Sequence, residues 1–228
     1  MSKKLSICIC VFNKFNFTKS CLNDLSKLSN DHEIIVVDNG STDETQSQLE
    51  NSKEIIYYRH AENKGFAGGS NQAYSLSSAN NVLFLNNDIR VKTNYSNWTQ
   101  PLIEACEENF LVGPTMGQLD KNFNFVQEAN RLLPGLSYMS GWCVAASKEI
   151  WNKLIIPNTN NQVFSEEFFC YFEDTDLGFR AKQLKIPLKI VEIPVVHFGK
   201  ISSKQINVPL LYKSAREIFV KKWKNVSI

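Results

Sequence analysis

Polar side chains that could hold a divalent cation follow a predicted strand in the first half of the chain. Asn86, Asn87 and Asp88 come directly after the apolar run at residues 82–85. A carboxylate at the carboxyl end of a parallel strand suits Mg²⁺ or Mn²⁺, because Mg²⁺ is commonly held by one or two protein carboxylates together with phosphate oxygens. Taken alone, the segment is more simply explained as a turn rich in Asn and Asp.

Acidic side chains also gather at the start of a predicted helix in the second half. Glu173, Asp174 and Asp176 follow the aromatic run at residues 168–172. Apolar surroundings desolvate a carboxylate and adjust its pKa, which suits a general base. Acids are favoured in the first turn of any helix by its macrodipole, and for Asp176 this structural explanation is the stronger one.

A further acid, Asp38, stands where the base of a nucleotide could be recognised. It ends a β-branched run and precedes Asn39, Gly40 and Ser41. A carboxylate there can accept a hydrogen bond from the ring N–H of a pyrimidine or guanine base, and the following helix N-terminus supplies free N–H groups. The alternative, in which Asp38 ends a strand and Ser41 caps a helix, has about equal weight.

Two other features have weaker chemical signals. His197 is a lone histidine, which is more often structural than a ligand, and it becomes a candidate because a cation at Asp88 needs further protein ligands. The glycine-rich segment at residues 63–71 fits neither standard phosphate-binding pattern. Ala67 stands where G-x-G-x-x-G needs glycine, and no G-K-[ST] follows. This weakens the NAD-enzyme and NTPase interpretations and leaves close packing of the backbone as a reason for the glycines.

The first half of the chain alternates between predicted strands and helices. The patterns predict strands at residues 5–12, 33–38, 55–59 and 82–85, and helices at residues 15–28, 41–51 and 66–79. Ser41 and Glu44 have the spacing of a capping box for the second helix. This order predicts an α/β fold with a mainly parallel sheet and helices on both faces. Ligands of such sheets bind outside the carboxyl ends of the strands.

The second half is less regular. We expect helices at residues 98–108, 147–154, 174–185 and 208–223, strands at 143–146 and 188–192, and a loop-rich segment at 109–135. Ser147 and Asp174 are the expected N-caps of their helices. No linker divides the chain, so a single domain over residues 1–228 is expected.

Composition excludes several classes of protein. The net charge of +2 is too small to indicate a nucleic-acid partner, and no apolar run approaches the roughly 20 residues that span a bilayer. The cysteines form no C-x-x-C pair, so we interpret them as reduced thiols of a cytoplasmic protein. The last helix carries basic and aromatic residues. We expect this helix to close the domain, and we favour this interpretation above the alternative of peripheral contact with the inner face of the membrane.

Taken in order, these segments resemble the inverting glycosyltransferases of family 2, which have the GT-A fold. The resemblance runs through most of the chain and is closest to the rhamnosyltransferase-like branch of polysaccharide-assembly enzymes. It rests on these segments: Val11-Phe12-Asn13, Val37-Asp38-Asn39-Gly40-Ser41-Thr42-Asp43, Asn63-Lys64-Gly65-Phe66-Ala67-Gly68-Gly69-Ser70-Asn71, Leu85-Asn86-Asn87-Asp88, Gly141-Trp142-Cys143, Phe172-Glu173-Asp174-Thr175-Asp176-Leu177-Gly178-Phe179-Arg180, and His197.

The resemblance implies a role for each matching residue. Asp174 would be the general base, with Glu173 as the second candidate, and Asp88 and His197 would hold Mn²⁺ or Mg²⁺ on the pyrophosphate of the donor. Gly141 and Trp142 would lie near the donor sugar and the acceptor. The implied nucleotide contacts, with Asp38 at the base, are Val11, Asn13, Asp38, Asn39, Lys64, Gly65, Asn71, Asn86, Asn87 and Asp88.

The resemblance also implies the substrates and the layout of the chain. The donor would be a nucleotide-sugar, with UDP as the default and dTDP and GDP left open, and the acceptor would be a glycan or a lipid-linked glycan. Residues 1–100 would form the nucleotide-binding half of a GT-A domain. Residues 101–228 would form the acceptor-binding half, closed by the C-terminal helix.

One departure and two alternatives bear on this interpretation. Asn86 stands where the D-x-D motif has its first acid, so we expect modest cation affinity. A sugar nucleotidyltransferase would need a glycine-rich loop after Phe12, and none is present. A non-catalytic nucleotide-sugar or glycan-binding module is left open by the sequence.

Overall fold

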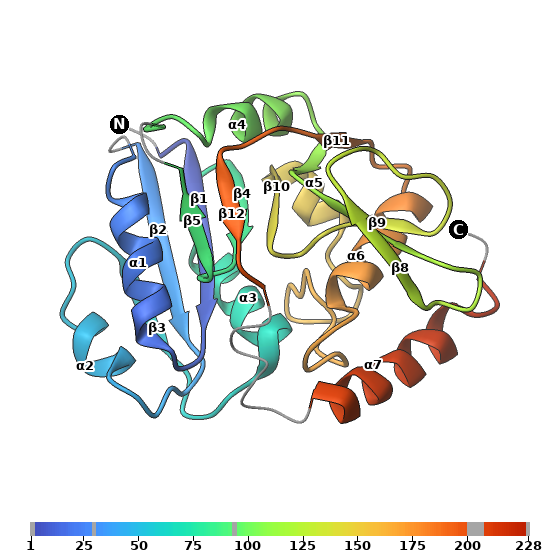
Figure 1. The fold of residues 1–228 in the computed structure, drawn as a ribbon, viewed down its shortest axis with the longest axis horizontal. Helices are drawn as coiled ribbons and strands as arrows, with labels where there is room; N and C mark the ends of the chain where they lie inside the picture. Colours follow the sequence, from blue (N-terminus) through green and yellow to red (C-terminus); the bar gives the residue numbers. More distant parts are fainter. Residues whose placement is uncertain (1–2, 29–30, 93–94, 200–207, 227–228) are drawn as a thin grey trace.

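The computed structural model describes residues 3–28, 31–92, 95–199 and 208–226. Within this part of the chain a seven-stranded sheet forms the centre of the molecule (Figure 1). Its strands are β1 (Leu5–Val11), β2 (His32–Asp38), β3 (Ile56–Arg59), β4 (Asn81–Leu85), β6 (Leu111–Gly113), β10 (Cys143–Ser147) and β11 (Leu188–Ile190). Their spatial order is β11-β6-β10-β4-β1-β2-β3.

The sheet is mainly parallel, as the alternation of strands and helices predicts. β1 pairs in parallel with both β2 and β4, β2 pairs in parallel with β3, and β6 pairs in parallel with β11. β10 is the exception, because it runs antiparallel to its neighbours β4 and β6. The carboxyl ends of β1, β2 and β4 therefore meet at one edge, where ligands of open α/β sheets bind.

Helices cover both faces of the sheet. Their bounds are α1 (Phe15–Leu25), α2 (Thr45–Leu49), α3 (Gly65–Leu76), α4 (Gln100–Glu107), α5 (Lys148–Lys153), α6 (Glu173–Gln183) and α7 (Val208–Trp223). Residues of α1, α2 and α4 share one core cluster with one face of the strands, and residues of α3, α5 and α6 share another with the opposite face. Along β4, Leu83 and Leu85 belong to the first cluster, whereas Val82 and Phe84 belong to the second. This alternation is what a strand buried on both sides requires.

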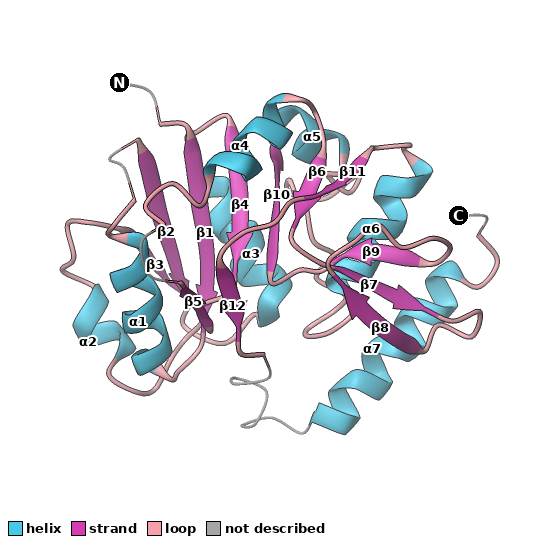
Figure 2. Ribbon diagram, turned by 45° about the horizontal axis from the view of Figure 1, so that its top comes forward, coloured by secondary structure: helices cyan, strands magenta, loops and turns pink. Residues whose placement is uncertain are grey.

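Two smaller sheets lie beside the central one (Figure 2). β5 (Ile89–Val91) pairs antiparallel with β12 (Val195–His197), and β7 (Met116–Leu119) lies between β8 (Phe125–Ala129) and β9 (Ser137–Met139). An aromatic cluster, in which Phe219 and Trp223 of α7 pack on Phe179 of α6, joins the last helix to the rest of the fold. No described helix combines the length and apolar character that crossing a membrane requires.

Most predicted elements are confirmed, with boundaries that shift by a few residues. The final helix at residues 208–223 and the cap of α5 are confirmed, since the Ser147 hydroxyl accepts a hydrogen bond from the Ile150 N–H. The loop-rich prediction for residues 109–135 is wrong, because β6, β7 and β8 lie there. These strands are short, and β8 is half exposed, so they lack the long apolar runs that mark a buried strand.

Two predicted helix caps are wrong. α2 begins at Thr45, and the Ser41 hydroxyl accepts a hydrogen bond from the Asn13 N–H instead of capping the helix. α6 begins at Glu173, so Asp174 lies inside its first turn and not at its N-cap. In both places the side chain that local spacing assigns to the helix end accepts a hydrogen bond from a distant part of the chain instead.

Candidate active site

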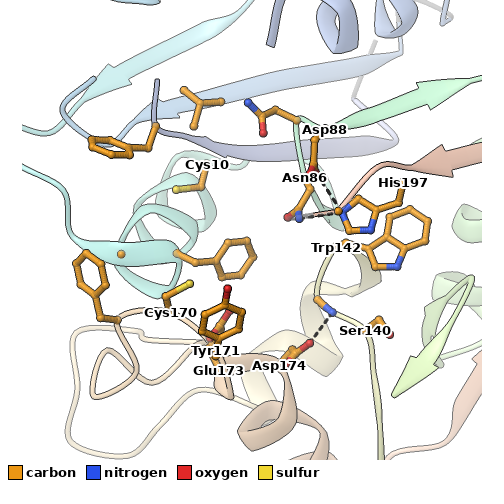
Figure 3. Close-up of a pocket in the computed structure, with 18 of the residues that line it drawn as sticks. Cys10, Asn86, Asp88, Ser140, Trp142, Cys170, Tyr171, Glu173, Asp174 and His197 are labelled. Carbon is orange, nitrogen blue, oxygen red and sulfur yellow. Dashed lines mark hydrogen bonds and ion pairs between the residues drawn. The ribbon is translucent and has the colours of Figure 1, made fainter. Parts of the chain in front are cut away.

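A pocket of about 550 Å³ opens at the carboxyl edge of the central sheet, a size typical of small-molecule sites. Val11 at the end of β1 and the segment from Asn86 to Asp88 after β4 line one side of it. Trp142 and His197 lie beside Asp88 on this side, and Glu173 and Asp174 at the start of α6 line the other side (Figure 3). The structure therefore brings Asp88, Asp174 and His197 to one cavity, although they lie far apart in the sequence.

His197 is held beside Asp88 by the pairing of β12 with β5. His197 is the partner of Ile89 in this ladder, and the Phe198 N–H donates to the Asp88 carbonyl at 2.9 Å. The imidazole Nε2 lies 3.1 Å from Asp88 Oδ1 and 3.4 Å from the Asn86 amide nitrogen (Figure 3). The sequence does not predict either short strand, so this contact could not be derived from it.

The Asp88–His197 pair fits two neighbouring ligands of a small cation. A carboxylate oxygen and an imidazole nitrogen are both donors that a divalent cation accepts, and these two atoms lie 3.1 Å apart. Among the described residues, no group of three or more His, Cys, Asp and Glu side chains could hold a metal. A cation bound here would therefore take its other ligands from water or from a phosphate-bearing ligand.

Trp142 lies flat against His197. The two ring centroids are 4.7 Å apart and the planes differ by 9°. The carbonyl of Trp142 accepts a 2.8 Å hydrogen bond from the Asn86 N–H, which ties the start of β10 to the end of β4. The indole Nε1 donates to the Thr115 hydroxyl at 2.9 Å and to Glu128 Oε1 at 3.1 Å.

Asp174 is a well-oriented carboxylate at the pocket wall. Its Oδ2 accepts from the Gly141 N–H at 3.0 Å, and its Oδ1 accepts from the Thr175 N–H at 2.7 Å. Burial raises its pKa above the ordinary value, although these hydrogen bonds oppose the shift. A carboxylate with a raised pKa, fixed in place and facing a pocket, has the properties of a general base.

The neighbouring Glu173 is in a different state. Its Oε2 is buried and accepts no hydrogen bond within the described structure. Burial, followed by the charge of Asp174, raises the pKa of Glu173 to about 8. As pH rises, Asp174 therefore loses its proton before Glu173 does, and Glu173 still carries its proton near neutral pH.

A tight backbone turn presents these two acids to the pocket. Tyr171 and Phe172, directly before α6, both have left-handed conformations, with φ of 73° and 68°. Such conformations are unfavourable for bulky residues and persist where the surroundings enforce them. Here the ring of Phe172 packs on Phe219 and Tyr212 of α7, so the last helix supports the turn.

Asp38 does not line the pocket. It is fully buried, and its Oδ1 accepts from the Ser41 N–H at 2.8 Å. Its Oδ2 accepts from the Tyr57 hydroxyl at 2.9 Å and forms an ion pair with Arg59. Both oxygens thus have protein partners, whereas the next residue, Asn39, does line the pocket.

Asn13, Lys64 and Asn71 also lie outside the pocket lining, and each has a structural contact. The side-chain oxygen Oδ1 of Asn13 accepts from the Thr42 N–H at 2.7 Å. Lys64 pairs with the exposed Glu62. The Asn71 amide binds the backbone of residues 163 and 164. Gly65, by contrast, lines the pocket with φ of +73°, and a Cβ there would lie 2.2 Å from the Phe169 carbonyl oxygen.

Several pocket residues were not predicted from the sequence. They are mainly aromatic or come from the segment interpreted as loop: Phe125, Glu128, Tyr138, Ser140, Cys170 and Tyr171. The half-exposed strand β8, with Phe125 and Glu128, has no alternation strong enough to reveal it. Cys10 and Cys170 also face the cavity, and burial raises the pKa of each thiol to about 12. Both are therefore protonated at neutral pH.

The family model described as glycosyl transferase family 2 matches residues 6–172, which is more than half of the chain. An uncharacterized glycosyltransferase of Rickettsia bellii (strain RML369-C) is 28% identical over 131 residues. That match covers 56% of this chain and 19% of the relative, so the chain spans about a fifth of the relative's length.

Two solved structures illustrate the likeness of this fold to known proteins. Residues 1–349 of TarS from S. aureus align with a TM-score of 0.56 at 18% identity, covering 79% of this chain and 55% of that chain. The mannosyltransferase PcManGT from Pyrobaculum calidifontis, in complex with GDP-Man and Mn²⁺, aligns with a TM-score of 0.56 at 13% identity, covering 85% of this chain and 55% of that chain. At these identities the likeness concerns the fold.

Proposed function

This chain belongs to glycosyl transferase family 2, and from that premise we propose that it transfers a sugar from a nucleotide-sugar to an acceptor hydroxyl with inversion at the anomeric carbon. The observation that carries the proposal is one cavity lined by Asp88 and His197 on one side and by Asp174 on the other. Sugar transfer needs a group that binds the donor diphosphate and a group that accepts the hydroxyl proton in one cavity.

In the proposed reaction, Asp174 removes the proton of the acceptor hydroxyl. The hydroxyl oxygen then attacks the anomeric carbon, and the bond from that carbon to the diphosphate oxygen breaks on the opposite face. The hydrogen bond from Gly141 holds the Asp174 carboxylate in one orientation, which reduces the reorganisation needed during attack. Tyr138, Trp142 and Tyr171 add aromatic residues to the pocket wall.

Asp88 and His197 would hold a divalent cation on the donor diphosphate. When bound, such a cation neutralises the charge that grows on the leaving group. PcManGT, in complex with GDP-Man and Mn²⁺, and TarS, in complex with UDP, support nucleotide-sugars and Mn²⁺ as the first ligands to test. UDP-sugars remain the default donor, and a hexose or deoxyhexose is the proposed sugar.

The acceptor we propose is a glycan or lipid-linked glycan, used in polysaccharide or glycoconjugate assembly. Exposed Phe125 and the ring of Tyr171 at the pocket wall support it, because aromatic faces pack on sugar rings. All six cysteines are free thiols, which supports the proposed cytoplasmic location.

A thermal-shift panel tests the donor site. UDP, dTDP, GDP and their sugars would be added with and without Mn²⁺, and a ligand at a hundredfold excess over its Kd stabilises the folded state by about 2.7 kcal/mol. We expect at least one nucleotide to raise the melting temperature, with a further increase from Mn²⁺. Asp88→Asn should lose the Mn²⁺-dependent part, while the distant exposed variant Glu149→Gln keeps it. A chain that no nucleotide stabilises would refute the proposed function.

A further inference from the structure

Glu128 on β8 connects the small sheet to the Asp88–His197 pair through the indole of Trp142. Glu128 Oε1 accepts the indole N–H of Trp142 at 3.1 Å and the Thr115 hydroxyl at 2.7 Å. The Thr115 oxygen accepts the same indole N–H at 2.9 Å. These three groups form a closed hydrogen-bonded triangle, which fixes the rotation of the indole about its χ angles.

The fixed indole in turn restricts the imidazole of His197. The two rings stack nearly parallel, 9° apart, with centroids at 4.7 Å. On its far edge the imidazole Nε2 faces Asp88 Oδ1 and the Asn86 amide. A rotation of the indole would remove the flat surface against which the imidazole lies, and Nε2 would no longer be directed at Asp88.

We propose that Glu128 is a positioning residue for His197, acting through Trp142 to keep the imidazole directed at the Asp88 carboxylate. The part of this inference that concerns cation and nucleotide binding rests on the proposed function. The part that concerns the orientation of His197 does not. Groups that orient a metal ligand without touching the metal typically change metal affinity by 10–100-fold when removed.

An exposed glutamate usually has little effect on structure, but Glu128 differs in its position and in its contacts. Glu128 is exposed, as a surface carboxylate normally is, yet it lines the pocket and accepts two side-chain hydrogen bonds. A second possible role is direct contact with the acceptor, since Glu128 is open to the cavity. The two roles predict different outcomes, because direct contact would leave the His197 ring unchanged.

The first measurement follows the histidine ring resonances by NMR in the absence of metal. The chain has three histidines, His32, His60 and His197, which makes assignment practical. Stacking on an indole shifts the His197 ring protons upfield, so Glu128→Ala should move them downfield while His32 and His60 stay in place. Glu128→Gln keeps an oxygen that accepts the indole N–H and should restore the wild-type positions. Glu149→Ala is the matched control on a distant exposed glutamate.

The second measurement titrates Mn²⁺ in the presence of UDP and follows free Mn²⁺ by EPR. Glu128→Ala should weaken Mn²⁺ binding by roughly 10–100-fold, and Glu128→Gln should recover most of the loss. If wild-type protein binds no Mn²⁺ with UDP, the cation and donor in the proposed function are wrong, and the NMR result still decides the positioning role. Unmoved His197 resonances in Glu128→Ala, or a Glu128→Gln variant that behaves like Glu128→Ala, would overturn the inference.

Discussion

The backbone N–H of Gly141 donates a 3.0 Å hydrogen bond to Asp174 Oδ2, and a methyl group on Gly141 would lie 2.9 Å from the Asp174 Cβ. The residue before Trp142 thus sets the position of the proposed base by direct contact. The same short segment also contacts Asn86 through the Trp142 carbonyl. The two chemical parts of the cavity are therefore joined through two consecutive residues.

Gly141→Ala should displace Asp174 while leaving the donor side of the pocket in place. Misplacing a reacting group by about 1 Å can cost on the order of 10²-fold in rate, so we expect a loss in kcat of that size. Nucleotide binding, measured by thermal shift, should be retained. A variant with wild-type kcat would mean that the Gly141 contact does not position the base.

Asp174→Asn should reduce transfer by roughly 10²–10⁴-fold, the usual effect of removing a positioned base. Glu173→Gln should be far milder near neutral pH, because burial and the charge of Asp174 raise the pKa of Glu173 to about 8 and it already carries a proton. Glutamine resembles that protonated form. Steady-state kinetics of both variants decide which acid is the base. A larger loss of transfer rate in Glu173→Gln than in Asp174→Asn would assign the base to Glu173.

The pH dependence of the rate should report the ionisation of Asp174. Its pKa is raised by burial, so the rate should rise with pH over a range above the ordinary aspartate pKa of 3.8. The Glu173→Gln variant should keep this acid limb and lose any second change near pH 8. An acid limb that disappears in Glu173→Gln would contradict the assignment of Asp174 as the base.

Glu173 should also make the protein less stable as pH rises. Its folded pKa of about 8 lies above the ordinary value of 4.5, so the folded state binds this proton more tightly than the unfolded state does. The stabilisation is fully present below pH 4.5 and is lost as pH rises through 8. The melting temperature of Glu173→Gln relative to wild type should therefore increase from pH 5 to pH 9. A melting-temperature difference that stays constant from pH 5 to pH 9 would contradict this prediction.

Much of the first half of the fold follows from the sequence because β2 and β4 contain apolar runs that contact both core clusters. The run at residues 34–37 and the apolar segment at residues 82–85 are clear in the sequence, and the mainly parallel pairing follows from the alternation with helices. The short strands β5 and β12 could not be predicted, because three residues of each give no period and their pairing spans 104 residues or more of chain. The His197 contact depends on that pairing.

The candidate site is only partly predictable for a related reason. Asp88, Asp174 and His197 were selected on residue type and resemblance, and all three line the cavity. Asp38 was selected on the same grounds, but its carboxylate forms an ion pair with Arg59 and accepts a hydrogen bond from Tyr57. Whether a side chain faces a pocket or a neighbouring strand depends on tertiary partners, which short motifs do not encode. Glu128 was missed because a lone glutamate in a half-exposed strand has no motif.

Asp176 is the clearest case of an acid that holds the fold together and takes no part in the chemistry. It is fully buried, and its carboxylate lies 2.9 Å from Arg180 Nε, 2.9 Å from Lys222 Nζ and 2.9 Å from the Trp223 indole nitrogen. Its partners on α7 tie the last helix to α6. This agrees with the structural explanation for Asp176 favoured by its place in the first turn of a helix.

Asp176→Ala should therefore destabilise the protein by about 3–5 kcal/mol, because it leaves the largely buried Arg180 without its charge partner. Trp223→Phe removes one hydrogen bond and keeps most of the aromatic packing, so it should cost about 1 kcal/mol. Chemical denaturation of both variants measures these values. Well below the melting temperature, Asp176→Ala should retain kcat, because Asp176 does not line the pocket. A folded Asp176→Ala protein with the activity loss of Asp174→Asn would instead place Asp176 in the reaction, and the assignment of the base would have to move two residues along α6.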